Sequence, residues 1–363
     1  MPKDGFQGKL IKGDNSVVLD RMIAEGTVVS CAYIDPPYNN KDRFDHYEDN
    51  KDYDIWEAEI IAVSSKIRSL LSEEGSLWVS IDDKLMHYLK VALDNVFGRE
   101  NFISTVVWEH RTTRENRAIF SNNHEYILVY AKNFEKFKSY RNPLPFTDEW
   151  KDRFKNPDND PRGPWQSVSA NAQAGHATAG QFYELVAPSG KRHLPPKGRC
   201  WLYTQARMNE AMREGRIYFG KGGSGVPRIK RYLREVKGGL TPHTLWKADE
   251  VGTTASAKKH LLDVLADVSV FETPKPEQLI SRILSIASNP GDLVLDAYLG
   301  SGTTASVAHK MDRRYVGIEL GEHIASHCVR RLRSVCQGEQ GGISKAVNWL
   351  GGGDFDLEDS AVA

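Results

Sequence analysis

The residues Tyr33 to Tyr38 read Tyr-Ile-Asp-Pro-Pro-Tyr and follow a nearly continuous apolar run that begins at Val28. Two consecutive prolines impose an extended, rigid backbone, and Pro36 also restricts the residue before it. The carboxylate of Asp35 and the carbonyl of Pro36 are therefore held in fixed directions beside the ring of Tyr38. A flat heterocycle with an exocyclic amine fits this frame, because the amine donates two hydrogen bonds while the ring stacks on tyrosine. The competing interpretation is a surface turn without chemistry.

A second loop follows the apolar residues Leu293–Asp296 and reads Asp-Ala-Tyr-Leu-Gly-Ser-Gly, ending at Gly302. Glycines between a strand and a helix let a ligand approach the backbone closely. Glu319 ends the next apolar segment, nineteen residues after Gly300, where an acidic side chain suits a ribose diol. The third glycine of the phosphate fingerprint is absent, as is a Walker sequence, which favours an adenosyl ligand without a pyrophosphate over NAD or ATP. A tight structural turn is the alternative.

Both loops need strands that end at one edge of a sheet, and the hydrophobic pattern predicts such strands. Short apolar segments alternate with segments of helical spacing, which is typical of a sheet flanked by helices. The expected strands are 8–12, 28–34, 76–81, 102–108, 125–130, 293–296 and 315–320, and the expected helices are 15–24, 54–72, 84–96, 277–287 and 303–311. Ligands of open α/β sheets bind at the carboxyl ends of the strands.

The alternation stops between about Asn133 and Leu240, where Pro, Gly, basic and aromatic residues accumulate and helical spacing returns only at 205–214. We interpret this stretch as an inserted domain of short strands and turns. The net charge of the chain is zero, yet residues 111–237 contain 24 Lys and Arg against 12 Asp and Glu, so the remainder carries an acidic excess. Aromatic residues interleave with the basic ones, which favours nucleic acid as the partner over a merely solvated basic segment.

Composition excludes several classes of protein. Of the 363 residues, 40% are hydrophobic and 26% are charged, so a globular fold with a sizeable core is expected. No run of eighteen apolar residues exists and the N-terminal residues lack the apolar stretch of a secretory signal, so we expect no membrane span and a cytoplasmic location. The four cysteines are widely separated, which disfavours a zinc ribbon or a disulfide framework. We expect no metal, and we interpret Asp82-Asp83 as a helix cap.

Together the two loops resemble those of the amino-group DNA methyltransferases that use S-adenosylmethionine. The Asp-Pro-Pro-Tyr box precedes the Gly-x-Gly loop here, which matches the permuted order of the β group, and the resemblance covers about residues 8–333. Further segments resemble the modification (Mod) subunits of type III restriction systems: Pro161–Trp165, Leu194–Trp201, Gly225–Arg228, Thr273–Glu277 and Asn289–Asp296. The resemblance implies a Rossmann-like α/β methyltransferase fold with an inserted target-recognition domain.

The resemblance also implies roles for individual residues. The catalytic box is matched by Asp35, Pro36, Pro37 and Tyr38, and the cofactor loop by Asp296, Tyr298, Gly300, Ser301, Gly302 and Thr303. Glu319 matches the acceptor of the ribose, Asp14 the acidic residue beside the adenine amine of the cofactor, and Lys275 a contact of the methionine carboxylate. The family usually has Phe at the position of Tyr298, and it often has Asn-Thr after the box, where this chain has Asn39-Asn40.

The implied function is transfer of a methyl group from S-adenosylmethionine to the N6 amine of an adenine flipped out of double-stranded DNA, in a restriction-modification system. The expected domains are a catalytic half (1–132), a target-recognition insert (133–245), a cofactor-binding half (246–336) and a flexible tail (337–363). A homodimer, a helicase-nuclease restriction subunit as partner and association with the nucleoid are compatible with this interpretation.

Three alternatives remain open. N4-cytosine methylation uses the same frame, although Asp rather than Ser at position 35 favours adenine. A nicotinamide or flavin oxidoreductase would explain the glycine loop but not the Asp35 box together with a basic insert. A DNA-binding module without catalysis would explain the charge but would need neither loop.

Overall fold

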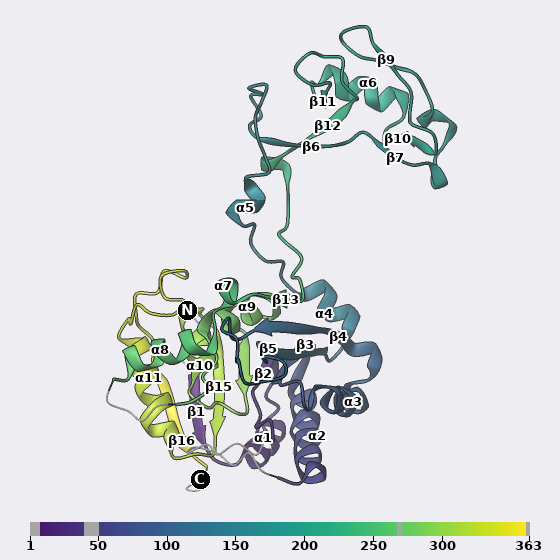
Figure 1. Ribbon diagram of the computed structural model, residues 1–363. Helices are drawn as coiled ribbons and strands as arrows, with labels where there is room; N and C mark the ends of the chain where they lie inside the picture. The colour runs from purple at the N-terminus through teal and green to yellow at the C-terminus, as the bar shows by residue number, and fades with distance from the viewer. Residues whose placement is uncertain (1–7, 40–50, 267–270, 361–363) are drawn as a thin grey trace. The chain divides into compact units, whose positions relative to one another are not determined.

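The computed structural model describes residues 8–39, 51–266 and 271–360. They form two compact units: the first comprises Met1–Asn142 with Thr241–Ala363, and the second comprises Pro143–Leu240. Figure 1 shows the two halves of the first unit, which are distant in the sequence, joined in one sheet. The second unit overlaps the predicted insert of 133–245 but has narrower boundaries. None of the helices in the described ranges has the length and apolar character that a membrane span needs.

The described part of the first unit is built on a nine-stranded sheet with the strand order β13–β4–β5–β3–β2–β14–β15–β1–β16. The strand bounds are Gly8–Lys12 (β1), Val29–Ile34 (β2), Leu71–Ile81 (β3), Phe102–Glu109 (β4), His124–Ala131 (β5), Leu245–Trp246 (β13), Leu293–Asp296 (β14), Arg314–Glu319 (β15) and Phe355–Asp359 (β16). The α/β fold predicted from the sequence is confirmed, and each of the seven expected strands is present.

The direction of the strands decides which loops meet. Strand β5 pairs antiparallel with both β3 and β4, whereas the other pairings of this sheet are parallel. Strands β2, β14 and β15 are neighbours and therefore end at the same edge, which brings the segment after Ile34 next to the loops after Asp296 and Glu319. Because β5 runs the other way, its first residues lie at this edge too.

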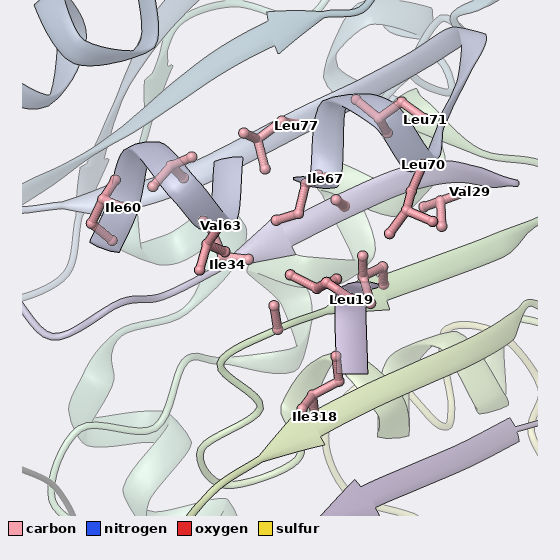
Figure 2. Close-up of a cluster of buried hydrophobic side chains, with 14 of the residues drawn as sticks. Leu19, Val29, Ile34, Ile60, Val63, Ile67, Leu70, Leu71, Leu77 and Ile318 are labelled. Carbon is pink, nitrogen blue, oxygen red and sulfur yellow. The ribbon is translucent and has the colours of Figure 1, made fainter. Parts of the chain in front are cut away.

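Helices cover both faces of the sheet. Helices α1 (Asn15–Ala24), α2 (Tyr53–Leu70) and α3 (Met86–Phe97) pack against one another. The core that includes α1 and α2 side chains contains Ala32 and Ile34 of β2, and Figure 2 shows its members on helices and strands. The alternate residues Cys31 and Tyr33 are also buried, on the face where α9 (Glu277–Ala287) contacts β2. Each buried aliphatic side chain contributes about 1.5–3 kcal/mol, so the strand ends have a rigid support.

The remaining helices of the first unit are α4 (Phe134–Tyr140), α7 (Ala248–Val251), α8 (Thr254–Val264), α10 (Thr303–Lys310), the π-helical turn Ile324–Val329 and α11 (Arg330–Cys336). Helix α4 belongs to this unit and not to the insert, because Phe137 is buried and α4 contacts β3. The backbone N–H of Asn142 also donates to the carbonyl of Ile286 at 2.9 Å. The hydrophobic spacing over these seven residues is too short to be recognised as a helix in the sequence.

The prediction that residues 337–363 form a flexible tail is wrong for the part of this segment that the structure describes. Strand β16 pairs in parallel with β1, with Phe355 opposite Gly8, and so covers what would otherwise be an open sheet edge. The indole N–H of Trp349 donates to the carbonyl of Val335 at 2.8 Å. A short strand in a Gly-rich, acidic segment gives little sequence signal, because its pairing partner lies at the other end of the chain. Residues 361–363 lie outside the described residues.

The second unit consists of short strands and turns, as its composition suggested. Its strands are β6 (Trp165–Ser169), β11 (Ile217–Tyr218) and β12 (Arg228–Tyr232) in one sheet, and the pairs β7 (Asn171–Gln173) with β10 (Arg199–Trp201) and β8 (Leu185–Val186) with β9 (Arg192–His193). Helix α6 (Gln205–Arg213) coincides with the expected helix, and helix α5 (Asp148–Lys151) is a single turn. A core that includes Trp201 and Met208 gives this unit its own hydrophobic centre.

Candidate active site

A cavity of about 260 Å³ lies at the carboxyl edge of the sheet, within the first unit. Its lining includes most of the site residues predicted from the sequence: Asp35, Pro36, Pro37, Tyr38, Lys275, Asp296, Tyr298, Gly300, Ser301, Thr303 and Glu319. The two loops that the sequence singled out, about 260 residues apart, therefore share one cavity. Gly302 and Asp14 do not belong to the lining.

The box Asp35–Tyr38 follows β2 directly, and its acidic side chain is held at both oxygens. The hydroxyl of Tyr38 donates to Oδ1 of Asp35 at 2.8 Å, and Nζ of Lys275 lies 2.8 Å from Oδ2. The indole of Trp56 donates to the carbonyl of Pro37 at 2.8 Å, which fixes the second proline. Burial raises the pKa of Asp35, and the charge of Lys275 opposes this effect. The carboxyl group is thus rigid and less acidic than an exposed aspartate.

Glu125 is a second carboxylate beside the box, and it is not among the site residues predicted from the sequence. Its Oε2 lies 3.1 Å from the hydroxyl oxygen of Tyr38, as an alternative acceptor for the single hydrogen that Tyr38 donates to Asp35, and 3.4 Å from Nζ of Lys275. Lys275 in turn donates to the hydroxyl oxygen of Tyr38 at 3.1 Å. Asp35, Tyr38, Glu125 and Lys275 therefore form one group of two carboxylates, one phenol and one ammonium. Glu125 reaches the site because β5 runs antiparallel, a direction that the sequence pattern does not reveal.

Lys275 connects the two halves of the site. Its side chain is 7% exposed, and its ammonium group is paired with Asp35 and Glu125. Its backbone carbonyl accepts a hydrogen bond from Oγ1 of Thr303 at 3.0 Å, which ties it to the glycine loop. The expected contact of Lys275 with a ligand carboxylate stays a prediction, while the structure places its ammonium at the catalytic box.

Carboxylate side chains accept hydrogen bonds from backbone N–H groups of the loop after β14 and thereby fix its conformation. Oδ1 of Asp296 accepts from the N–H of Tyr298 at 3.0 Å, and burial raises the pKa of Asp296 to about 7. Gly300 has φ of +54°, and its N–H donates to Oε2 of Glu319 at 2.8 Å. The other oxygen of Glu319 accepts from the N–H of Gly321 at 2.9 Å. Glu319 therefore shapes the glycine loop and still has lone pairs to offer a ligand.

Gly302 serves packing rather than ligand approach. Its φ is +79°, and a Cβ atom there would lie 3.3 Å from the Cα of Cys328. The residue starts helix α10 and lets the turn that carries Cys328 come close. The predicted cofactor role of Gly302 stays a prediction, since its φ and its closeness to Cys328 already explain a glycine here.

Asp14 is exposed and caps helix α1, where its side chain accepts from the N–H of Val17 at 3.2 Å. Its neighbour Asn15 donates to the carbonyl of Ala297 at 3.1 Å, so this turn contacts the glycine loop from outside the cavity. The assignment of Asp14 to an adenine amine stays a prediction, because an N-cap role already explains an aspartate at this position.

The residue after the box has a structural role. Asn39 exchanges two hydrogen bonds with the backbone of Lys51, at 2.8 and 2.9 Å. Asn40, which completes the departure from the family pattern, lies outside the described residues. Oδ1 of Asp82 accepts from the N–H groups of Lys84 and Leu85 at 3.1 and 3.3 Å. These bonds lie in the turn before helix α3, whose N-cap is Leu85, and Asp82 also contributes to the cavity wall.

Among the described residues, one group has the geometry to hold a metal ion: His260, Glu277 and Glu339. Both carboxylates are already paired with Nζ of Lys310, and Glu277 is also 3.1 Å from Arg331. Burial alone would raise the pKa of Glu277, but Arg331 and Lys310 outweigh it and hold that pKa below its usual value. The cluster is a neutralised ion-pair network that joins α9 to α10 and α11, so we assign it no ligand.

The side chains that line the cavity fit an adenosyl ligand that carries a reactive group. The carboxylate of Glu319 stands at a strand end beside a glycine loop, which is the place of a ribose acceptor in nucleotide-binding sheets. Tyr298 supplies an aromatic wall, and the box with Asp35 and Tyr38 lines the same cavity. A bound nucleoside and a flat amine-bearing ring can therefore meet inside one enclosed space, as a group transfer between them requires.

Comparisons with known proteins agree with this chemistry. A family model described as DNA methylase matches residues 29–330. The HindVI Mod subunit of Haemophilus influenzae is 28% identical over 95% of this chain and 53% of its own length. The type III restriction-modification enzyme StyLTI Mod subunit of Salmonella typhimurium is 31% identical over 81% of this chain and 48% of its own length. The chain thus spans about half the length of these two relatives.

One solved structure supports the fold assignment. The PvuII DNA methyltransferase, described as cytosine-N4-specific, superposes with a TM-score of 0.50 at 11% identity, over 97% of this chain and 95% of that one. At this identity the similarity concerns the fold alone and carries no information on the target base.

Proposed function

The chain belongs to the N6/N4 DNA methylase family, and from that premise we propose that it transfers a methyl group from S-adenosylmethionine to the N6 amine of a flipped adenine in double-stranded DNA. The observation that carries the proposal is the shared cavity: the Asp35–Tyr38 box and the Gly300 loop with Glu319 line one space. A DNA-binding module without catalysis would have no use for that cavity. A dinucleotide oxidoreductase would have no use for the box.

S-adenosylmethionine fits the residues of the second loop. Glu319 would accept from the ribose hydroxyls, Gly300 would allow close approach of the backbone, and Tyr298 would flank the adenine. The bound cofactor supplies an electrophilic methyl group, whose bond to sulfur breaks with its electron pair staying on sulfur as the bond to nitrogen forms.

In this proposal Asp35 is the residue that activates the amine of the substrate. An exocyclic amine of adenine is a poor nucleophile because its lone pair is delocalised into the ring. Asp35 and the carbonyl of Pro36 accept the two amine hydrogens, which turns the lone pair toward the methyl group, and one of these protons passes to Asp35 after transfer. The raised pKa of Asp35, caused by its burial, makes it the better proton acceptor.

The substrate amine must take a place at Asp35 that Tyr38 and Lys275 occupy in the free site. Glu125 lowers the free energy that this exchange requires, because its Oε2 already lies 3.1 Å from the Tyr38 hydroxyl and 3.4 Å from Nζ of Lys275. Both groups keep a carboxylate partner when they leave Asp35, so no buried charge is left unpaired. The ring of Tyr38 remains available to stack on the flipped base.

Adenine is favoured over cytosine by Asp35, since the Asp-Pro-Pro-Tyr form of the box resembles that of the adenine enzymes. N4-cytosine methylation is the second candidate, because the same frame of carboxylate, carbonyl and aromatic ring would hold the exocyclic amine of cytosine. The deciding experiment incubates the chain with labelled S-adenosylmethionine and plasmid DNA and then separates the nucleosides by mass spectrometry. N6-methyl-2′-deoxyadenosine supports the proposal and N4-methyl-2′-deoxycytidine supports the alternative. Absence of label in DNA that the wild-type chain binds contradicts both.

Loss of the ribose acceptor should weaken cofactor binding. Glu319→Ala is expected to raise the Kd for S-adenosylmethionine by about 10- to 100-fold, because it removes a charged hydrogen-bond acceptor and frees the N–H of Gly300. Isothermal calorimetry measures the Kd, with Glu322→Ala as the matched control, since Glu322 is 88% exposed and pairs only with Lys12 in the described structure.

Gly300→Val should also raise the Kd for S-adenosylmethionine. Its φ of +54° disfavours a branched residue, and a Cβ atom there would lie 3.3 Å from the ring of Phe271. Unchanged affinity in both site variants would show that the cofactor pocket is misplaced.

We propose further that Pro143–Leu240 selects the DNA sequence and that a restriction subunit cooperates with this chain, as the names of the Mod relatives suggest. The unit has its own core and much of the basic excess, so it can vary independently of the catalytic unit. Exchange of this segment for that of a relative with a different site should change the methylated motif and leave cofactor affinity within a few fold. Sequencing of methylated DNA reads the motif. A folded, active chimera that still modifies the original motif would refute the assignment.

A further inference from the structure

The segment that joins β4 to β5, residues 110–123, is placed at the catalytic cavity. The last pair of the two strands, Glu109 with His124, closes the segment at its base. His110 and Asn122, near its two ends, belong to the cavity lining. Hairpin loops usually contain about two to five residues, and much longer ones are most often functional. We call this segment the β4–β5 loop.

The tip of the β4–β5 loop presents two large apolar side chains to solvent. Ile119 is 96% exposed and Phe120 is 88% exposed, the highest values of any isoleucine or phenylalanine among the described residues. Such adjacent exposure on a loop beside an active site is typical of a surface that meets a partner.

Hydrogen bonds within the loop hold this tip in place. The side-chain amide of Asn123 donates to the carbonyls of Arg111 and Thr113, at 2.7 and 2.9 Å. Oγ of Ser121 accepts from the N–H of Glu115 at 2.9 Å. The loop is therefore a preformed projection, which lowers the entropy lost when its tip is inserted elsewhere.

The charge around the tip points to a polyanion. Arg114 and Arg117 are exposed on the same loop, whereas its acidic residue Glu115 lies 3.7 Å from Arg111. Arginines beside apolar side chains are the combination with which proteins bind phosphates and wedge between base steps. A purely protein-binding tip would not need the arginines, nor a place at the cavity wall.

We propose that Phe120, supported by Ile119, enters the base stack of DNA and fills the gap left by the flipped target nucleotide. This inference rests on the proposed function and adds the element that keeps the base extruded. A flipped nucleotide stays joined to its backbone, so the gap lies next to the cavity that receives the base. Phe120 is two residues from Asn122 of the cavity wall, which limits their Cα atoms to about 7 Å. Arg114 and Arg117 contact the phosphates that flank the gap.

Base flipping is tested with the full chain, S-adenosylhomocysteine and a duplex with the mapped recognition site, in which 2-aminopurine replaces the target adenine. Turnover is measured separately, with S-adenosylmethionine and the same duplex carrying adenine. Fluorescence should rise when the wild type flips the base. Phe120→Ala should lose most of this rise and lower kcat/KM for DNA on the order of tenfold or more, whereas Phe120→Leu should keep most of both. A mismatch opposite the target should restore the rate of Phe120→Ala, because an unpaired base needs less help to leave the stack.

Leu350→Ala is the matched control, since Leu350 is also 88% exposed but lies in the C-terminal segment, away from the cavity lining. It should behave as the wild type, and all variants should bind S-adenosylmethionine equally. Wild-type flipping and rates in Phe120→Ala overturn the proposal. So does a change of oligomeric state in Phe120→Ala with normal flipping, which would assign the tip to protein contacts. If the wild type itself methylates no DNA, the proposed function fails; if it does and only the Phe120 effects are missing, the wedge alone fails.

Discussion

Replacement of Asp35 by alanine is expected to remove methyl transfer to DNA, with a loss of about 10²- to 10⁴-fold or more in kcat. In the proposed mechanism the carboxylate accepts an amine hydrogen, and both of its oxygens contact groups that the substrate amine would replace. We expect that Glu125 does not take over this role, because it lies on β5 rather than in the box and is already paired with Tyr38 and Lys275. Single-turnover transfer of labelled methyl groups to DNA measures the loss.

The same variant should retain its fold and its cofactor affinity. Lys275 keeps Glu125 as a counter-ion 3.4 Å away, so removal of Asp35 leaves no buried ammonium without a carboxylate. Glu319 and Gly300, which are expected to hold the adenosyl part of S-adenosylmethionine, are hydrogen-bonded to each other and not to Asp35. Calorimetry should give a Kd within a few fold of the wild type. Near-normal turnover of Asp35→Ala would contradict the mechanism, and a lost affinity would show that Asp35 supports the cofactor instead.

The sequence predicted those parts of the site that are local. A loop after an apolar strand is readable from a few neighbouring residues, which is why the Asp35 box and the Gly300 loop were both found. The positions of the strands and the α/β class follow from the same local periodicity, although β3 begins at Leu71 and not at residue 76. That the two loops share a cavity followed from one rule, the common carboxyl edge of parallel strands.

What the sequence could not give depends on pairings between distant segments. Glu125 lies in the site because β5 is antiparallel to β3 and β4. Hydrophobic spacing does not indicate the direction of a strand, so the sequence could not predict this position. Strand β16 is recognisable only through its pairing with β1. Lys275 was found, but its predicted partner was a ligand, whereas Asp35 and Glu125 surround its ammonium group. Asp14 was placed by analogy with a motif, and the capping of α1 explains it locally.

The contacts of Lys275 predict a second large effect, on the pH dependence of transfer. Asp35 would act as a carboxylate in the proposed reaction. Burial raises its pKa, the charge of Lys275 lowers it and the charge of Glu125 raises it. In Lys275→Met two carboxylates remain around Tyr38 without a cation, so one of them takes up a proton more readily. The pKa of Asp35 should rise, and the acid limb of kcat should move to higher pH. At neutral pH we expect a loss on the order of tenfold that recovers as the pH is raised.

Glu125→Gln should shift the acid limb in the opposite direction, because it removes the negative charge that raises the pKa of Asp35. His110, whose Nδ1 lies 3.9 Å from Oε1 of Glu125, has a pKa lowered by burial and titrates in all variants, so each profile is compared with that of the wild type. The double variant removes one charge of each sign, and its acid limb should return toward the wild-type position. Profiles of kcat from pH 5 to 9 measure the three shifts. Equal displacement of both single variants in one direction would show that general loosening of the site, and not the balance of charge around Asp35, controls the reaction.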